Sequence, residues 1–169
     1  MVSKSETSLF EDLLDEDEDT LKDKYLTFEI AGEGHGIEIR YVTEIIGVQK
    51  ITEVPDTPDY VLGIINLRGT VIPVVNVRIR LGLEPVEFDD QTCVIVVNVE
   101  ETVVGFLVDK VREVVEIPEG MVEPPPKVSK SSASRFMQGL GKAGDGVIIV
   151  LDIHKLLYDE KPEKTSDAA

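Results

Sequence analysis

The sequence is poor in aromatic residues, basic residues and cysteine, and these deficits limit how the core is built and which partners are expected. Of the 169 residues, 5% are aromatic and none is tryptophan, so valine, isoleucine and leucine must build the core from an apolar fraction of 42%. The 17 Lys and Arg residues stand against 33 Asp and Glu residues, which leaves a formal net charge of −16. Such a charge repels nucleic-acid phosphates and anionic lipid headgroups, so neither nucleic acid nor a membrane surface is an expected partner.

The single cysteine and the short apolar runs limit the compartment in which the protein is expected. Cys93 has no partner for an internal disulfide and belongs to no Cys/His spacing typical of a metal site. No apolar run approaches the roughly 20 residues that span a bilayer. Acidic residues also stand near the N-terminus, where a signal peptide carries Lys or Arg before an apolar block. We therefore expect a cytoplasmic protein with no membrane insertion and no metal.

An internal duplication organises the chain. At an offset of 69 residues, 25–48 align with 94–117 without a gap, and at an offset of 76 a second block aligns Gly63 with Gly139 and Asn76 with Asp152. Both copies consist of short runs rich in Val and Ile, separated by Gly and Pro, which is typical of strands. Asn and Asp are favoured N-cap residues, so Asn76 and Asp152 predict short helices over 77–81 and 153–158.

The predicted fold class is therefore all-β: two small β-barrels of about five strands each, with a short helix ending each copy. Residues 24–92 are expected to form the first subdomain and 93–159 the second. The first 23 residues hold nine acidic residues and two lysines, and they are expected to be a mobile tail or, alternatively, a docking peptide with a short helix over 8–14. Residues 160–169 are expected to be a mobile C-terminus.

Enzyme motifs are scarce in this sequence. Residues 139–144 match GxGxxG formally, but a strand follows them, whereas a dinucleotide site needs a helix there. Gly32, Gly34 and Gly36 predict a hairpin turn that exposes His35, and His154 is expected on the surface of the last helix. Since no nucleophile lies in a pattern with a base, we predict no catalytic residue, no cofactor and no enzymatic activity.

One arginine distinguishes the first copy from the second. Arg68 falls opposite Gly144, so the second copy has no cation at this position. An arginine in an otherwise apolar strand and turn needs a carboxylate partner, and Glu44 is the candidate. The pair either holds a turn or forms a recognition site for another protein. Glu113, the repeat-mate of Glu44, slightly favours the structural role for that carboxylate.

Three blocks of the sequence resemble the CheW family, the chemotaxis coupling proteins. Residues 63–78, GIINLRGTVIPVVNVR, closely resemble the signature of that family, and 104–111, VGFLVDKV, resemble its second-half motif. The run from 139 to 157 resembles its C-terminal block. The resemblance extends over 24–158 and implies one CheW-like domain over 24–159. That domain would consist of two five-stranded SH3-like or OB-like barrels around a third apolar core, with strand exchange between the barrels left open.

The resemblance also implies a function. CheW-like proteins are non-catalytic and bridge the histidine kinase CheA, through its regulatory domain, to the cytoplasmic tips of methyl-accepting chemoreceptors. A member would be cytoplasmic and associated with membrane receptor arrays through its partners. Carried over by motif, the kinase-binding residues would be Gly139, Leu140 and Gly141, in a turn. The receptor-binding residues would be Val42, Glu44, Gly63, Arg68, Val111 and Val114.

Three alternatives remain open at this point. A CheV-like adaptor or the regulatory domain of the kinase itself would carry a receiver or an ATPase domain, for which this chain has no room. A barrel that binds a small ligand would show a ligand-induced shift in melting temperature. An enzyme would need turnover that no set of residues here predicts.

Overall fold

The computed structural model describes residues 21–125, 135–144 and 146–158. Nearly all of the predicted N-terminal tail, including the helix expected over 8–14, and the whole of the predicted C-terminal tail lie outside these residues.

Within the described residues the chain is mostly β, which confirms the predicted fold class. The elements, in chain order, are β1 (Lys24–Ile30), β2 (Glu33–Glu38), η1 (Ile39–Tyr41), β3 (Val42–Gly47), β4 (Val61–Leu67), β5 (Thr70–Asn76), α3 (Val77–Arg80), β6 (Cys93–Val99), β7 (Thr102–Val108), β8 (Lys110–Glu116), η2 (Glu119–Met121), β9 (Val122–Glu123), β10 (Met137–Ala143), β11 (Gly146–Leu151) and α4 (Ile153–Tyr158).

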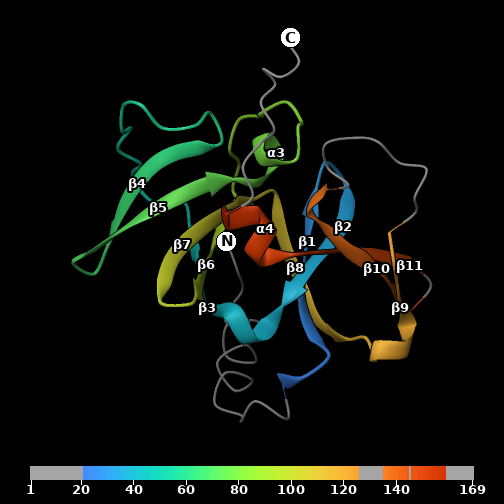
Figure 1. Ribbon diagram of the computed structural model, residues 1–169. Helices are drawn as coiled ribbons and strands as arrows, with labels where there is room; N and C mark the ends of the chain where they lie inside the picture. The colour runs from blue at the N-terminus through green and yellow to red at the C-terminus, as the bar shows by residue number, and fades with distance from the viewer. Residues whose placement is uncertain (1–20, 126–134, 145, 159–169) are drawn as a thin grey trace, which may run out of the picture.

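The strands form two sheets, and each sheet draws strands from both copies of the repeat. The six-stranded sheet has the order β8-β1-β2-β11-β10-β9, and the five-stranded sheet has the order β3-β6-β7-β5-β4 (Figure 1). The first hairpin of each copy therefore lies in the sheet built from the remaining strands of the other copy. Each exchanged hairpin joins its sheet by one parallel pairing, β2 with β11 or β7 with β5, and by one antiparallel pairing, β1 with β8 or β6 with β3.

The five-stranded sheet curls until its two ends approach each other. Thr52, which follows β3, and Ile64 of β4 exchange two backbone hydrogen bonds of 2.9 Å. In the part of the chain that the structure describes, this single bridge takes the place of a full ladder between β3 and β4. The sheet is thus barrel-like but closes at one point.

Three apolar clusters hold the two sheets, as the resemblance implied. The largest takes side chains from both sheets and from α3 and α4, including Phe28, Phe106 and Phe136. A second cluster, around Ile72, lies within the five-stranded sheet, and a third, around Ile117, lies within the six-stranded sheet. Because the largest cluster is shared, neither sheet buries its apolar face without the other.

The two predicted helix starts are confirmed. The Asn76 Oδ1 accepts hydrogen bonds from the backbone N–H groups of Arg78 and Ile79, at 2.9 and 3.4 Å. The Asp152 Oδ1 accepts from those of His154 and Lys155, at 3.0 and 3.2 Å. A side-chain oxygen at this position satisfies N–H groups that have no partner inside the helix.

The interpretation of the first hairpin was partly wrong. Its turn consists of Ala31 and Gly32, with φ of +54° and +80°, whereas Gly34 and Gly36 lie inside β2. A Cβ at Gly34 would come within 2.7 Å of Arg112 Nη1 and 2.8 Å of Ile148 Cδ1, so this glycine permits close packing rather than a turn.

His35 is consequently a strand residue and is buried, not exposed. Its side chain stacks on Phe28, and its Nδ1 lies 3.0 Å from the Glu33 carbonyl oxygen. The residue is 6% exposed, and this burial lowers the pKa of the imidazole.

Candidate functional site

The predicted pair between Arg68 and Glu44 forms at the surface. Arg68 occupies the two-residue turn between β4 and β5 with a φ of +52°, followed by Gly69 at +87°. Its Nη2 donates a hydrogen bond to Oε2 of Glu44 on β3. This ion pair connects the β4–β5 turn to β3, which lies at the opposite end of the five-stranded sheet from β4. The side chain of Arg68 is 68% exposed and that of Glu44 31% exposed. An exposed pair contributes about 1 kcal/mol or less to stability, so both polar groups remain available to another molecule.

Gly63 has a structural reason to be glycine. Its φ is +149°, and a Cβ at this position would lie 2.2 Å from the Thr52 carbonyl oxygen. Only glycine allows the chain to make the Thr52–Ile64 bridge that draws the ends of the sheet together. Gly63 is itself buried, so it contributes to the predicted receptor-binding site by shaping the backbone of β4.

The three predicted valines belong to the central core. Val42 is 2% exposed and lies within this cluster, while Val111 and Val114 are half-buried and pack against it, as does Ile45. Val42 and Ile45 lie on β3, and Val111 and Val114 lie on β8, each an outermost strand of its sheet. We call the half-buried Ile45, Val111 and Val114 the apolar seam. Each of the three packs against the central core and is also partly exposed, so the core is accessible from these outermost strands.

The predicted kinase-binding residues lie in a strand, so the turn expected there was wrong. Gly139, Leu140 and Gly141 belong to β10, which pairs with β11 on one side and with β9 on the other. A Cβ at Gly139 would lie 2.6 Å from the Glu123 carbonyl oxygen, and one at Gly141 would lie 2.7 Å from Ile117 Cδ1. The glycines thus allow β9 and the residues before it to pack closely on β10, and Leu140 is the half-buried member of the three.

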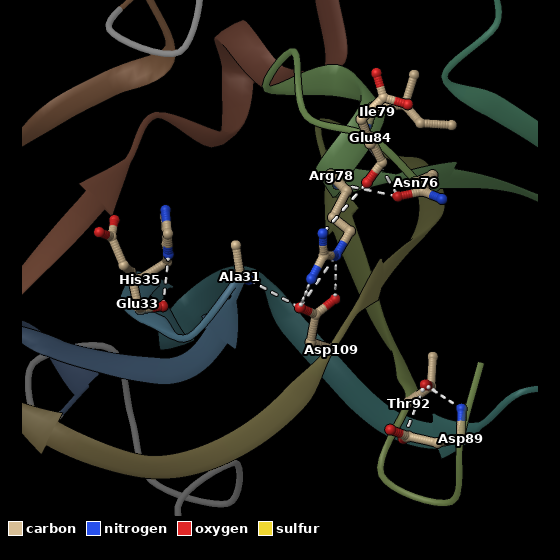
Figure 2. Close-up of polar contacts among 10 residues, drawn as sticks. All are labelled: Ala31, Glu33, His35, Asn76, Arg78, Ile79, Glu84, Asp89, Thr92 and Asp109. Atoms are coloured by element: carbon tan, nitrogen blue, oxygen red, sulfur yellow. Dashed lines mark hydrogen bonds and ion pairs between the residues drawn. The ribbon is translucent and has the colours of Figure 1, made fainter. Parts of the chain in front are cut away.

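A clamp between Arg78 and Asp109 joins both sheets and was missed by sequence reasoning (Figure 2). Arg78 Nε lies 2.9 Å from Asp109 Oδ1, and Nη2 lies 2.8 Å from Oδ2, which also accepts a 2.8 Å bond from the Ala31 backbone N–H. The side chains of Arg78 and Asp109 are 17% and 25% exposed, and the bonds to Asp109 raise the pKa of Arg78. Both residues stood inside recognised motifs, but no local pattern paired them.

A second arginine of α3 is buried against the other short helix. Arg80 is 4% exposed, and its Nε and Nη2 donate to the carbonyl oxygens of Leu156 and Lys155, at 2.8 and 3.2 Å. Its guanidinium also lies over the rings of Tyr60 and Phe136, at 4.1 and 4.7 Å from their centroids. This contact fixes α4 against α3 and carried no signal in the sequence.

The described residues contain no group of three or more His, Cys, Asp or Glu side chains arranged to hold a metal ion. They also contain no helix that is both long and apolar enough to cross a bilayer.

The fold and the surface together define a class: a small, internally duplicated β scaffold with an exposed ion pair and an apolar seam. A family model of the CheW-like domain matches residues 24–161. The chemotaxis protein CheW of Klebsiella aerogenes is 35% identical over 143 residues, which cover 85% of this chain and 86% of that protein. The chemotaxis protein CheW of Thermotoga maritima is 37% identical over 144 residues, with coverage of 83% and 92%.

A solved structure agrees with the sequence matches. The crystal structure of the scaffolding protein TtCheW from Thermoanaerobacter tengcongensis matches with a TM-score of 0.75 and 35% identity, over 82% of this chain and 95% of that one. The chain therefore belongs to the CheW-like family of non-catalytic chemotaxis proteins, which confirms the resemblance seen in its motifs.

Proposed function

We propose that this protein couples the histidine kinase CheA to the cytoplasmic tips of methyl-accepting chemoreceptors, and that it does so in the cytoplasm. The observation that carries the proposal is the match to the CheW-like domain over 24–161, which spans nearly all of the described chain. A coupling protein needs two partner surfaces on one body, because holding both partners together raises their effective concentration.

The apolar seam and the adjoining ion pair are the proposed receptor surface. Val111 and Val114 offer half-buried apolar contact, Val42 supports them from the core, and Arg68 and Glu44 offer exposed charge. Apolar anchors beside a charged rim suit a helix that lays one face into a groove. Gly63 maintains the backbone geometry of this region through the Thr52 bridge.

The face of β10 is the proposed kinase surface. Leu140 is half-buried and pairs with Ile149 of β11, and further along β11 Val147 is 57% exposed. Gly139 and Gly141 would contribute by keeping β9 and β10 close rather than by direct contact.

We also propose that residues 24–92 and 93–159 form two subdomains that exchange their first hairpins and work as one unit. Each half lends its first hairpin to the sheet of the other half, and the central cluster takes side chains from both. Such a shared core supports a rigid scaffold, in which the receptor surface and the kinase surface keep a constant separation.

The test is a titration of the full chain into the purified CheA regulatory domain, with and without receptor tip fragments. We expect saturable binding that survives moderate salt and a ternary complex when all three components are present. The Arg68→Ala and Glu44→Ala variants should fold normally and form less ternary complex while still binding the kinase domain.

The matched control is Arg40→Ala, which removes a comparable surface pair. Arg40 Nε lies 2.8 Å from Glu38 Oε1, with side chains 54% and 29% exposed. This variant should bind both partners as the unmodified protein does. Absence of saturable binding to either cognate partner would refute the coupling function, and unfolding of Arg68→Ala would assign its ion pair to structure alone.

A further inference from the structure

The loop between α3 and β6 exposes several large apolar side chains to solvent. Residues 82–90, which we call the α3–β6 loop, are all exposed and belong to no helix or strand. Leu83, Val86 and Phe88 are 41%, 49% and 45% exposed. Three large apolar side chains are thus exposed within six consecutive residues, and a local concentration of exposed apolar side chains on a soluble protein is a candidate interaction site.

Both ends of the loop are held in place. At its start, the Leu83 N–H donates to the Arg78 carbonyl oxygen at 2.8 Å, and Arg78 Nη1 donates to the Glu84 carbonyl oxygen at 3.2 Å. At its end, the Asp89 N–H donates to Thr92 Oγ1 at 2.9 Å, and the Thr92 N–H donates to the Asp89 carbonyl oxygen at 3.2 Å (Figure 2).

These anchors leave only residues 85–88 between them, and Pro85 restricts its own φ. Arg78 is in turn held by Asp109, so the start of the loop is tied to the clamp that joins the sheets. A segment ordered before binding loses little conformational entropy when a partner covers it. The hydrogen bonds therefore hold the backbone of the loop at both ends, on either side of Val86 and Phe88.

The charge of the loop indicates what covers it. Four acidic residues, Glu84, Glu87, Asp89 and Asp90, share the loop with the apolar residues, and all four are exposed. A second copy of this chain would bring the same acidic loop and a net charge of −16. The chain's own first 23 residues, with nine acidic residues, would be repelled in the same way, as would an anionic membrane.

We propose that the α3–β6 loop is a docking segment for a partner protein whose apolar groove is rimmed by lysine and arginine. Val86 and Phe88 enter the groove, and Glu84 and Glu87 pair with the basic rim. The proposal goes beyond the coupling function above, because the loop belongs neither to the apolar seam nor to β10.

The test begins with the full chain in its host cell, carrying the photo-cross-linker benzoyl-phenylalanine in place of Phe88. A matched chain carries the same group in place of Met121, which is 46% exposed on η2. We expect the probe at Phe88, and not the probe at Met121, to cross-link one partner at an apolar pocket that mass spectrometry maps between Lys and Arg residues.

The second step measures affinity with that purified partner. The Leu83→Ser/Val86→Ser/Phe88→Ser variant and the Glu84→Lys/Glu87→Lys variant should each bind at least about tenfold more weakly, while Met121→Ser binds normally. Thermal unfolding should be unchanged in all three, because the substituted side chains are exposed. A partner that is the kinase or the receptor supports the proposal equally if its pocket has this chemistry.

Four outcomes would overturn the proposal. They are equal cross-linking from the two probe positions, cross-links to a second copy or to the chain's own termini, a mapped site that is acidic or lacks an apolar pocket, and unchanged affinity of the two loop variants.

Discussion

Arg78 and Asp109 are separated by 31 residues in sequence, and they form a bidentate ion pair between α3 and the connection from β7 to β8. Asp109 lies between β7 of the five-stranded sheet and β8 of the six-stranded sheet, and it also accepts a bond from Ala31 in the turn of the first hairpin. One carboxylate thus connects the exchanged hairpin to the sheet that receives it.

Loss of this clamp should destabilise the protein substantially. We expect Arg78→Ala or Asp109→Ala to lower the free energy of unfolding by about 2 kcal/mol, because each leaves a partly buried charge without its partner. Urea denaturation provides the measurement. The exposed pair Arg40–Glu38 serves as the control, and its Arg40→Ala variant should lose less than about 1 kcal/mol. Equal losses in the two pairs would contradict the structural role of the clamp.

Three glycines allow the contributions of strain and steric clash to be separated. Gly63 combines a φ of +149° with a Cβ position 2.2 Å from the Thr52 oxygen, Gly69 has a φ of +87° with open space, and Gly47 has neither constraint. Substitution by alanine should cost more than about 3 kcal/mol at Gly63, about 1 kcal/mol at Gly69 and almost nothing at Gly47. Chemical denaturation measures the free energy of unfolding of the three variants. A loss at Gly63 no larger than that at Gly69 would show that the Thr52 bridge contributes little to stability.

The turn between β6 and β7 stores backbone strain. Glu100 and Glu101 have φ of +52° and +70°, in a two-residue turn whose repeat-mate is Ala31 and Gly32. Because glycine adopts this conformation without the Cβ penalty, Glu101→Gly should raise the free energy of unfolding by about 1 kcal/mol. A melting temperature that stays the same or falls would count against stored strain at this turn. Glu53→Gly is a suitable control outside the turn.

Burial of His35 should make stability depend on pH. Desolvation lowers the pKa of this imidazole, so the unfolded chain takes up a proton at a higher pH than the folded chain does. The stability is fully present above the unfolded pKa of about 6.5, and it is lost as the pH falls from there towards the folded pKa.

The free energy of unfolding, measured by urea denaturation between about pH 5 and pH 8, checks this dependence. Part of the loss on acidification should disappear in His35→Gln. The same substitution at the partly exposed His154 controls for a general effect of removing a histidine. An unchanged pH profile in His35→Gln would show that other groups cause the dependence.

Much of the candidate site could be read from the chain itself. The Arg68–Glu44 pair was predicted because an arginine in an apolar strand and turn needs a carboxylate, and the two helix caps followed from Asn76 and Asp152. The duplication predicted two similar five-stranded barrels, where the structure has a six-stranded and a five-stranded sheet that both mix the copies, and the motifs predicted the family. These inferences depend on properties of short sequence segments, such as capping residues and motifs, or on the alignment of the two copies.

Other features depended on contacts that no local pattern contains. His35 was expected in an exposed turn, and Gly139 and Gly141 were expected in another turn. In both places side chains from a distant segment pack closely on a strand: Arg112 and Ile148 lie over Gly34, and Ile117 lies over Gly141. A Cβ atom at either glycine would clash with these side chains, so the close packing requires glycine. From sequence alone, a glycine that makes a turn and one that makes room for a neighbour look the same.

By itself the sequence determined the alternation of strands, the starts of the two short helices, the duplication and the family. Only the tertiary structure decided that each copy lends its first hairpin to the other, that Arg78 meets Asp109, and that Arg80 reaches the carbonyl oxygen of Leu156, 76 residues away. The physical reason is that strand and cap preferences act between neighbours along the chain. The choice of partner sheet depends instead on burying one apolar core between both copies at once.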